Sequence, residues 1–220
     1  MVGSLLGTMG LFLLFLGFVG SRVTGRLIGI FIDTRNKVSL SQFQIVLWTW
    51  ILLSGYIVIV FARAFANEPE PLKVAWDERL WGLMGITIGS TIASGAVKNV
   101  KKGKDLPAPA AATFTAARPG IARQGILVVN AAPRDATLWD MFRGEEPANF
   151  DLIDIGKVQM FIFTLIAVLT YLVALFQLLG QKPAQIEAMP ALDHGLVFIL
   201  GISHAGYLGS KWTDKQPTSS

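Results

Sequence analysis

The sequence predicts an all-α integral membrane protein, a bundle of five transmembrane helices. Of its 220 residues, 52% are hydrophobic and only 15% are charged, whereas soluble globular domains carry about 25% charged residues. The mean hydropathy is also positive, at +0.52. Five apolar runs approach the roughly 20 residues that a helix needs to cross a bilayer core. Cysteine is absent, which excludes disulfides, thiolate metal sites and thiol catalysis.

The apolar runs span residues 2–21, 43–62, 80–97, 158–179 and 191–209. The first four contain no charged side chain, whereas the last contains Asp193, His194 and His204. A cleaved signal peptide is the alternative for the first run, but no basic residue precedes it and no A-x-A-like cleavage site follows it. We therefore expect a retained helix there.

The basic residues predict the orientation, because cytoplasmic loops retain Lys and Arg. With the N-terminus outside, fifteen basic residues face the cytosol and four face outward. The opposite orientation would reverse this strong bias. We therefore expect the N-terminus outside and the C-terminus in the cytoplasm.

This topology divides the chain into six parts. They are an N-terminal transmembrane helix (1–21), a cytoplasmic connector (22–40), a two-helix unit (41–98), a cytoplasmic linker (99–156), a second two-helix unit (157–211) and a cytoplasmic tail (212–220).

The two units resemble each other, which suggests a duplication. At a shift of 115 residues, Gln44, Thr49 and Tyr56 recur as Gln159, Thr164 and Tyr171. The match continues at a shift of 116, where Asp77 corresponds to Asp193 and Gly85-Ile86-Thr87 corresponds to Gly201-Ile202-Ser203. Each unit has an even number of spans, so the expected repeats are parallel, with residues 1–21 as an addition. Chance similarity between apolar helices is the alternative.

The second unit carries two further motifs, a Gln159-Met160 helix start preceded by Phe150-Asp151, and Gly201-Ile202-Ser203 followed by Tyr207-Leu208-Gly209-Ser210-Lys211. In these motifs the chain resembles a family of functionally uncharacterised bacterial multi-pass membrane proteins, over residues 33–98 and 150–211. The resemblance implies architecture, a bacterial inner (plasma) membrane location and no catalytic residues. The first unit departs from the pattern, since Thr91 stands where Tyr207 would be.

The segment 99–156 differs in composition from the helices. Its first part, Lys101 to Ala112, predicts a flexible linker whose lysines rest on lipid headgroups. Further on, we expect a short strand over 126–129 and a short amphipathic helix over 136–143 with Asp135 as N-cap. That helix would dock on the membrane or on a cytoplasmic protein partner.

Small residues recur every four positions on two of the runs, and such stripes let helices approach closely in lipid. The stripes are Gly85, Gly89 and Ala93 on one run and Gly201, Ala205 and Gly209 on the other. On the opposite side of 80–97, Thr87, Thr91 and Ser94 fall within about 60° of one another, as candidate pore-lining hydroxyls. The alternative is that these hydroxyls bond to carbonyls of their own helix.

His204 is the ionisable residue deepest in a predicted span, which makes it a candidate functional residue. A neutral imidazole bonded to a neighbouring helix and a proton relay are the two interpretations. Haem ligation is poorly supported, because the chain has only two His and both lie on the same run. The sequence also lacks a P-loop and a G-x-G-x-x-G placed after a strand.

We therefore expect no enzyme activity, no cofactor, no metal site and no nucleic-acid partner. The first functional hypothesis is a homo-oligomeric protein in the lipid bilayer that anchors or organises a larger bacterial assembly, with 99–156 as the cytoplasmic contact. The alternative is an ion channel or small transporter with residues 80–97 lining the pore.

Overall fold

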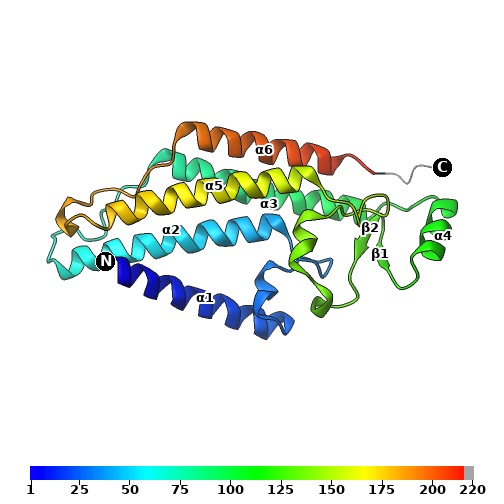
Figure 1. The fold of residues 1–220 in the computed structure, drawn as a ribbon, viewed down its shortest axis with the longest axis horizontal. Helices are drawn as coiled ribbons and strands as arrows, with labels where there is room; N and C mark the ends of the chain where they lie inside the picture. The colour runs from blue at the N-terminus through cyan, green and yellow to red at the C-terminus, as the bar shows by residue number, and fades with distance from the viewer. Residues whose placement is uncertain (216–220) are drawn as a thin grey trace.

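The computed structural model describes residues 1–215 as a predominantly helical protein (Figure 1). The long helices are α1 (Val2–Thr24), α2 (Leu40–Phe65), α3 (Glu78–Lys102), α5 (Ile155–Leu178) and α6 (His194–Trp212). The shorter elements are η1 (Leu27–Phe31), α4 (Ala108–Ala117), β1 (Ala122–Gln124), β2 (Leu127–Val129), η2 (Pro133–Asp135), η3 (Leu138–Phe142) and η4 (Pro183–Gln185). The prediction of an all-α architecture is confirmed apart from one small hairpin.

Helices α2, α3, α6 and α5 form a four-helix bundle, in which each packs against the next and α5 returns to α2. α2 and α3 form one antiparallel hairpin, and α5 and α6 form the other (Figure 1). α3 and α6 run side by side in the same direction: a Cβ on Gly82 would lie 3.9 Å from Val197, and one on Gly201 would lie 3.6 Å from Ile86. α1 lies outside this bundle, against α2 and η1.

The two ends of the bundle are built differently. The loop end holds the connections 66–77 and 179–193, and the lobe end holds residues 25–39, 103–154 and 213–215 (Figure 1). At the loop end a parallel bridge pairs Ala75 with Ala188. At the lobe end an antiparallel hairpin pairs Ala122 with Val129 and turns at Gly125, whose φ of 60° suits glycine. The predicted connector, the predicted linker and the described part of the predicted tail (212–215) thus share one end.

Asp77 and Asp193 have the same local role at the loop end. Asp77 caps α3 by accepting from the backbone N–H of Arg79, and Asp193 caps α6 by accepting from Gly195 and Leu196. A side-chain acceptor at this position satisfies otherwise unpaired amides of the first turn. These are equivalent positions of the predicted repeat, and the duplication itself stays a prediction.

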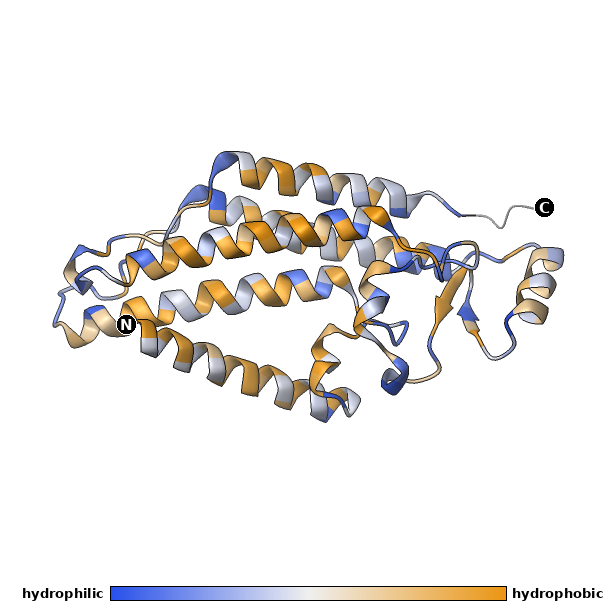
Figure 2. Cartoon of the chain, viewed as in Figure 1, coloured by the Kyte–Doolittle hydropathy of each residue, from blue (hydrophilic) through white to orange (hydrophobic). Residues whose placement is uncertain are grey.

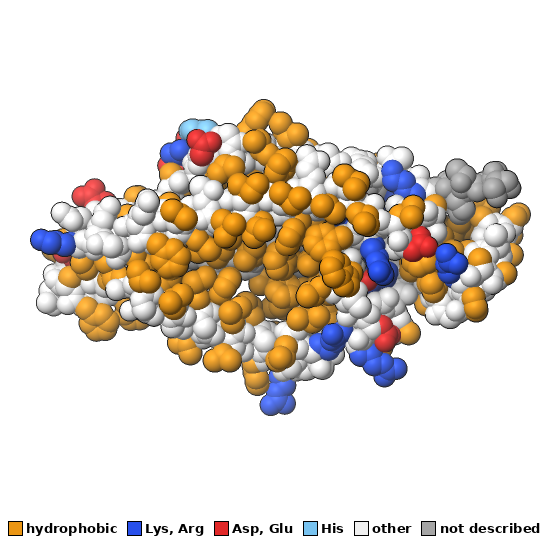
Figure 3. Space-filling view, viewed as in Figure 1, with side chains coloured by type: hydrophobic (Ala, Val, Ile, Leu, Met, Phe, Trp, Pro, Cys, Tyr) orange, Lys and Arg blue, Asp and Glu red, His pale blue; other side chains and the backbone are white. Residues whose placement is uncertain are grey.

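Four helices, α1, α2, α3 and α5, are long and apolar enough to cross a membrane. α6 is not among them, because its 19 residues include His194, His204 and Lys211. A fifth span therefore stays a prediction. Hydrophobic residues dominate the middle of the long helices (Figure 2), and on the face in Figure 3 charged side chains gather toward the two ends.

The segments at the lobe end, residues 25–39, 103–154 and 213–215, are together called the lobe. The lobe has more regular structure than the sequence indicated. α4 occupies 108–117, so the prediction of a flexible linker is wrong there. The predicted headgroup contact is also wrong for Lys101, because its side chain is buried, with 2% of it exposed, and pairs with Glu146. The predicted strand is confirmed by β2.

The predicted amphipathic helix over 136–143 is wrong in its type and its cap. A 3-10 helix, η3, covers only Leu138–Phe142, and Asp140 Oδ2 accepts from the backbone N–H of Thr137 at 2.8 Å. Asp135 instead ends η2, where its carboxylate accepts from Ala132. The Asp135 carboxylate therefore stabilises η2 and does not cap η3.

Candidate functional site

A buried charge cluster joins the lobe to the ends of the bundle helices. It comprises Asp33, Arg35, Lys98, Lys101, Glu145, Glu146, Lys157 and Lys211. Each of these side chains is at most 11% exposed. They come from the connector before α2, the ends of α3 and α6, the start of α5 and the loop after η3. The connector, the loop after η3 and the helices α3, α5 and α6 thus meet at this cluster.

Glu145 lies at the centre of the charge cluster. Its Oε1 accepts from Lys211 Nζ at 2.7 Å, from Lys157 Nζ at 3.1 Å and from Arg35 Nη2 at 3.3 Å. Lys211 Nζ also donates to the hydroxyl of Tyr207 at 2.8 Å, and Lys157 Nζ to the carbonyl of Arg143 at 2.7 Å. One carboxylate oxygen therefore couples α5, α6 and the connector.

Asp33 and Glu146 extend the cluster to α3. Asp33 Oδ2 accepts from Lys98 Nζ at 2.5 Å and from Arg35 Nη2 at 2.9 Å. Glu146 Oε1 accepts from Lys101 Nζ at 2.5 Å, and Lys101 Nζ also donates to the carbonyl of Thr213 at 2.9 Å. α3 is thereby fastened to the connector, the lobe and the segment that follows α6.

Charge pairing decides the protonation of these groups. Burial by itself would raise the pKa of Glu145, but the positive charges of Arg35, Lys157 and Lys211 outweigh it and hold the pKa well below its usual value. The pKa of Asp33 is lowered in the same way, by Arg35 and Lys98 against burial. Burial lowers the pKa of Lys211, which lies beyond the apolar run 191–209, to about 7.

A polar layer crosses the interior of the bundle further from the lobe. It comprises Gln44, Ser90, Thr164 and His204, one from each bundle helix, and each is at most 3% exposed. Gln44 Nε2 donates to Thr164 Oγ1 at 2.6 Å. Because Gly201 faces Ile86, His204 lies three residues further along α6 at the level of Ser90 on α3. Three polar atoms of this layer have no hydrogen-bond partner in the described residues: Gln44 Oε1, Ser90 Oγ and His204 Nδ1.

The predicted packing role of the small residues is wrong within the chain. A Cβ on Gly85, Gly89 or Gly209 would meet open space. Ala205 is exposed and Ala93 is half-buried, so only Gly201 faces another helix, at Ile86. The reason is that α3 turns its other face, with Thr87, Ser90 and Ser94, into the bundle.

Of the predicted pore-lining residues, Thr87 and Ser94 are buried in the bundle interior and Thr91 is half-buried. Thr87 Oγ1 donates to the carbonyls of Leu83 and Met84, and Thr91 Oγ1 donates to that of Thr87 at 2.8 Å. The alternative of bonding within the helix is thus confirmed for both threonines, and Thr91 Oγ1 also lies 3.2 Å from the carbonyl of Ser41 on α2, to which it donates. Ser94 Oγ is buried without a hydrogen-bond partner among the described residues.

The repeat-equivalent polar residues do not have equivalent environments. Gln44 is buried whereas Gln159 is exposed, and Tyr171 is buried whereas Tyr56 is half-buried and donates to the carbonyl of Leu72 at 3.3 Å. Thr164 lies in the polar layer, while its counterpart Thr49 is half-buried. The two hairpins therefore place the same residue types in different environments.

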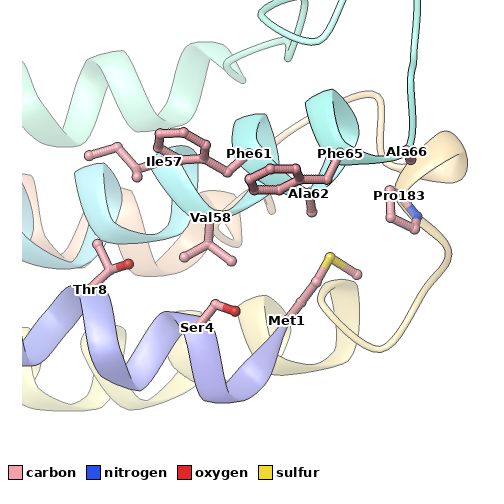
Figure 4. A pocket seen from close by; sticks show the side chains of 10 residues that line it. All are labelled: Met1, Ser4, Thr8, Ile57, Val58, Phe61, Ala62, Phe65, Ala66 and Pro183. Atoms are coloured by element: carbon pink, nitrogen blue, oxygen red, sulfur yellow. The ribbon is translucent and has the colours of Figure 1, made fainter.

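An apolar groove of about 530 Å³ separates α1 from α2 near the loop end (Figure 4). Its lining includes Met1, Thr8 of α1, Phe61 and Phe65 of α2, and Pro183. No lining side chain is ionisable. Such a surface suits hydrocarbon rather than a polar substrate.

The sequence reasoning missed the charge cluster. Lys98, Lys157 and Lys211 each adjoin an apolar run, a signal that places them together at one membrane face. Nothing in the pattern indicates that Glu145, in the middle of the linker, folds back onto all of them. That placement depends on the tertiary fold of the lobe.

Among residues 1–215, no group of three or more His, Asp or Glu side chains could hold a metal ion. Comparison of the chain with protein-family models, with curated proteins and with solved structures finds no match. The resemblance to the bacterial multi-pass family therefore rests on its motifs alone.

Proposed function

We propose that this chain is a non-enzymatic, homo-oligomeric protein of the bacterial inner membrane that anchors or organises a larger assembly. The observation that carries the proposal is the charge cluster, which fastens the lobe to α3, α5 and α6 and to the connector that leads into α2. A lobe held in this way presents a fixed surface to a cytoplasmic protein. The lobe end faces the cytosol and the loop end faces outward, in keeping with the bias of basic residues.

The outward-facing stripes support self-association. Gly85 and Gly89 on α3, with Ala205 and Gly209 on the adjacent α6, lie on the surface of the chain. Small residues at such a surface allow the backbone of another helix to approach closely in lipid. The stripes thus keep the packing role that the sequence suggested, but between chains.

Disulfide trapping in native membranes tests the self-association, because the chain has no cysteine of its own. We expect Gly89→Cys to give a covalent dimer upon mild oxidation. Leu169→Cys on α5 is the matched control, since its side chain is 54% exposed on another helix. Dimers of the control alone, or of neither variant, would contradict the proposal.

A channel or small transporter is the second candidate function. The unpaired buried polar atoms of Gln44, Ser90, Ser94 and His204 favour it, because polar groups in a membrane bundle commonly mark a polar pathway. Conductance of purified protein in liposomes distinguishes the two functions. Specific conductance that Thr91→Leu alters would favour transport over anchoring.

A further inference from the structure

The interior of the bundle changes from apolar to polar along its axis. Toward the loop end the interior is filled by Leu80, Leu83, Ile59, Leu175 and Leu200, each at most 1% exposed. Toward the lobe end the same four helices turn polar side chains inward. An apolar half of this kind excludes water and ions, whereas a polar half does not.

The polar layer stands at the boundary between the two halves. On its loop side, Trp48 and Tyr171 meet edge to face with ring centroids 6.0 Å apart. The leucines lie beyond this aromatic pair. Two mainly apolar tiers therefore separate His204 from the loop end, and they bury Trp48 Nε1, Ser54 Oγ and Tyr171 Oη without a hydrogen-bond partner in the described residues.

Polar side chains continue from the layer to the charge cluster. On α3, Ser90, Ser94 and Lys98 are buried at four-residue intervals, and so fall on one face of the helix. On α6, His204 is followed by Tyr207 and Lys211, about 10 Å further along the helix. Tyr207 accepts from Lys211, which in turn reaches Glu145. Polar groups are thus spaced along α3 and α6 from His204 to the lobe end, and hydrogen bonds join the last three of them, Tyr207, Lys211 and Glu145.

Several atoms of this series lack partners. Ser41 Oγ, Ser90 Oγ, Ser94 Oγ and His204 Nδ1 are buried without a hydrogen bond in the described residues. Leaving a buried polar group unpaired is unfavourable, so natural proteins satisfy such groups with protein partners or ordered water. Water held by these hydroxyls would carry protons between His204 and the charge cluster.

The ionisable groups around His204 all lie toward the lobe end, apart from one phenol. α3 contributes Lys98 and Lys101, α5 contributes Lys157 and Tyr171, and α6 contributes Tyr207 and Lys211. Glu145 and Asp33 complete the set from the lobe and the connector. On the loop side of the polar layer lie Tyr171 of α5 and, at the far end of the bundle, Arg63 of α2, which donates to the carbonyls of Ile186 and Glu70.

We propose that His204 is a proton-binding site with access from the lobe end only. A proton from water at the lobe end passes along the hydroxyl and water series to the neutral imidazole, which becomes imidazolium, and it returns by the same route. His204 thereby reports the pH of the compartment at the lobe end.

Infrared difference spectroscopy of histidine labelled with 15N in the imidazole tests this inference in the full chain. His194→Gln leaves His204 as the single histidine. Vesicles with the lobe end outward are selected through biotin on Thr115→Cys, and those with the loop end outward through Gln181→Cys; both positions are exposed. The external pH is then stepped from about 8 to about 4, because burial disfavours the charged form of an imidazole, while an internal dye confirms that the pH of the lumen stays unchanged.

We expect imidazolium bands within seconds in the vesicles with the lobe end outward, and none in the others. Bands in both orientations, bands only with the loop end outward, or no bands in either would each overturn the proposal.

Two matched variants test the route itself. Ser94→Val removes an unpaired buried hydroxyl between the polar layer and Lys98, and Ser54→Val removes one on the loop side in α2. The response to lobe-end pH should be lost in Ser94→Val and retained in Ser54→Val, with helix content checked by circular dichroism. Equal responses of the two folded variants would refute the route.

Discussion

The two ends of the bundle bury positive charge in different ways. At the loop end, the guanidinium of Arg63 donates to the backbone carbonyls of Ile186 and Glu70. At the lobe end, five cations share the three carboxylates Asp33, Glu145 and Glu146. A carbonyl contact joins two loops locally, whereas a shared carboxylate makes each cation depend on the others. The lobe end should therefore respond far more strongly to the loss of a single charge.

Glu145→Gln should have the largest effect. It keeps the side-chain shape but leaves Arg35, Lys157 and Lys211 without their common counter-charge. Breaking a buried ionic network in this way costs about 3–5 kcal/mol. Unfolding in mixed micelles should show a loss of that order.

The control for this variant is Asp151→Asn, which breaks an exposed pair with Arg118 whose side chains are 50% and 47% exposed. Exposed pairs contribute about 0–1 kcal/mol, so little should change. Glu145→Gln combined with Lys211→Met should recover part of the loss, because one unpaired cation is removed. If the two single variants were equally stable, the charge cluster would not be a stabilising centre.

Arg63→Met should have a smaller effect, at the opposite end. The variant retains an apolar stem but leaves two carbonyls without their donor, a loss of about 1–3 kcal/mol. Limited proteolysis should show faster cleavage in 66–77 and 179–193 with the lobe unaffected. Faster cleavage in the lobe instead would mean that the ends are not independent.

Acid should weaken the lobe end selectively. The pKa values of Glu145 and Asp33 are lowered in the folded protein, so their stabilising contribution is complete above about pH 4.5 and is lost as the pH falls below it. Each group contributes at most about 1.4 kcal/mol per pH unit to the pH dependence of the free energy of unfolding. The melting temperature, measured at several values between pH 6 and about 3, should change less with pH in Glu145→Gln than in the native chain.

The architecture could be predicted from the sequence to a large extent, because apolar run length is a local property. The hairpin order and the shared end of 22–40 and 99–156 followed from it. The small-residue stripe and the hydroxyl face of α3 were both recognised, but their directions could not be assigned, since an apolar bilayer accepts either face outward. Glu145 could not be found at all, because its role depends on contacts with Arg35 and Lys211, which are 110 and 66 residues away.

Gly89→Leu should have the smallest effect on the isolated chain. Position 89 faces open space, so the melting of the monomer should change by less than about 0.5 kcal/mol. Gly201→Leu should cost about 1–3 kcal/mol, because its side chain would collide with Ile86. In membranes, Gly89→Leu should impair self-association more than Gly201→Leu does, and it should lower the dimer yield. A destabilised Gly89→Leu monomer would show that α3 packs on this face after all.

Native-state hydrogen exchange of Glu145→Gln against the native chain tests the central claim most directly, namely that the charge cluster clamps the lobe onto the bundle. We predict that amides of 126–129 and 142–154 exchange at least about tenfold faster in the variant, a difference of about 1.4 kcal/mol, while the amides of α2 and α5 remain protected. Unchanged protection of both lobe segments in the variant would contradict the claim.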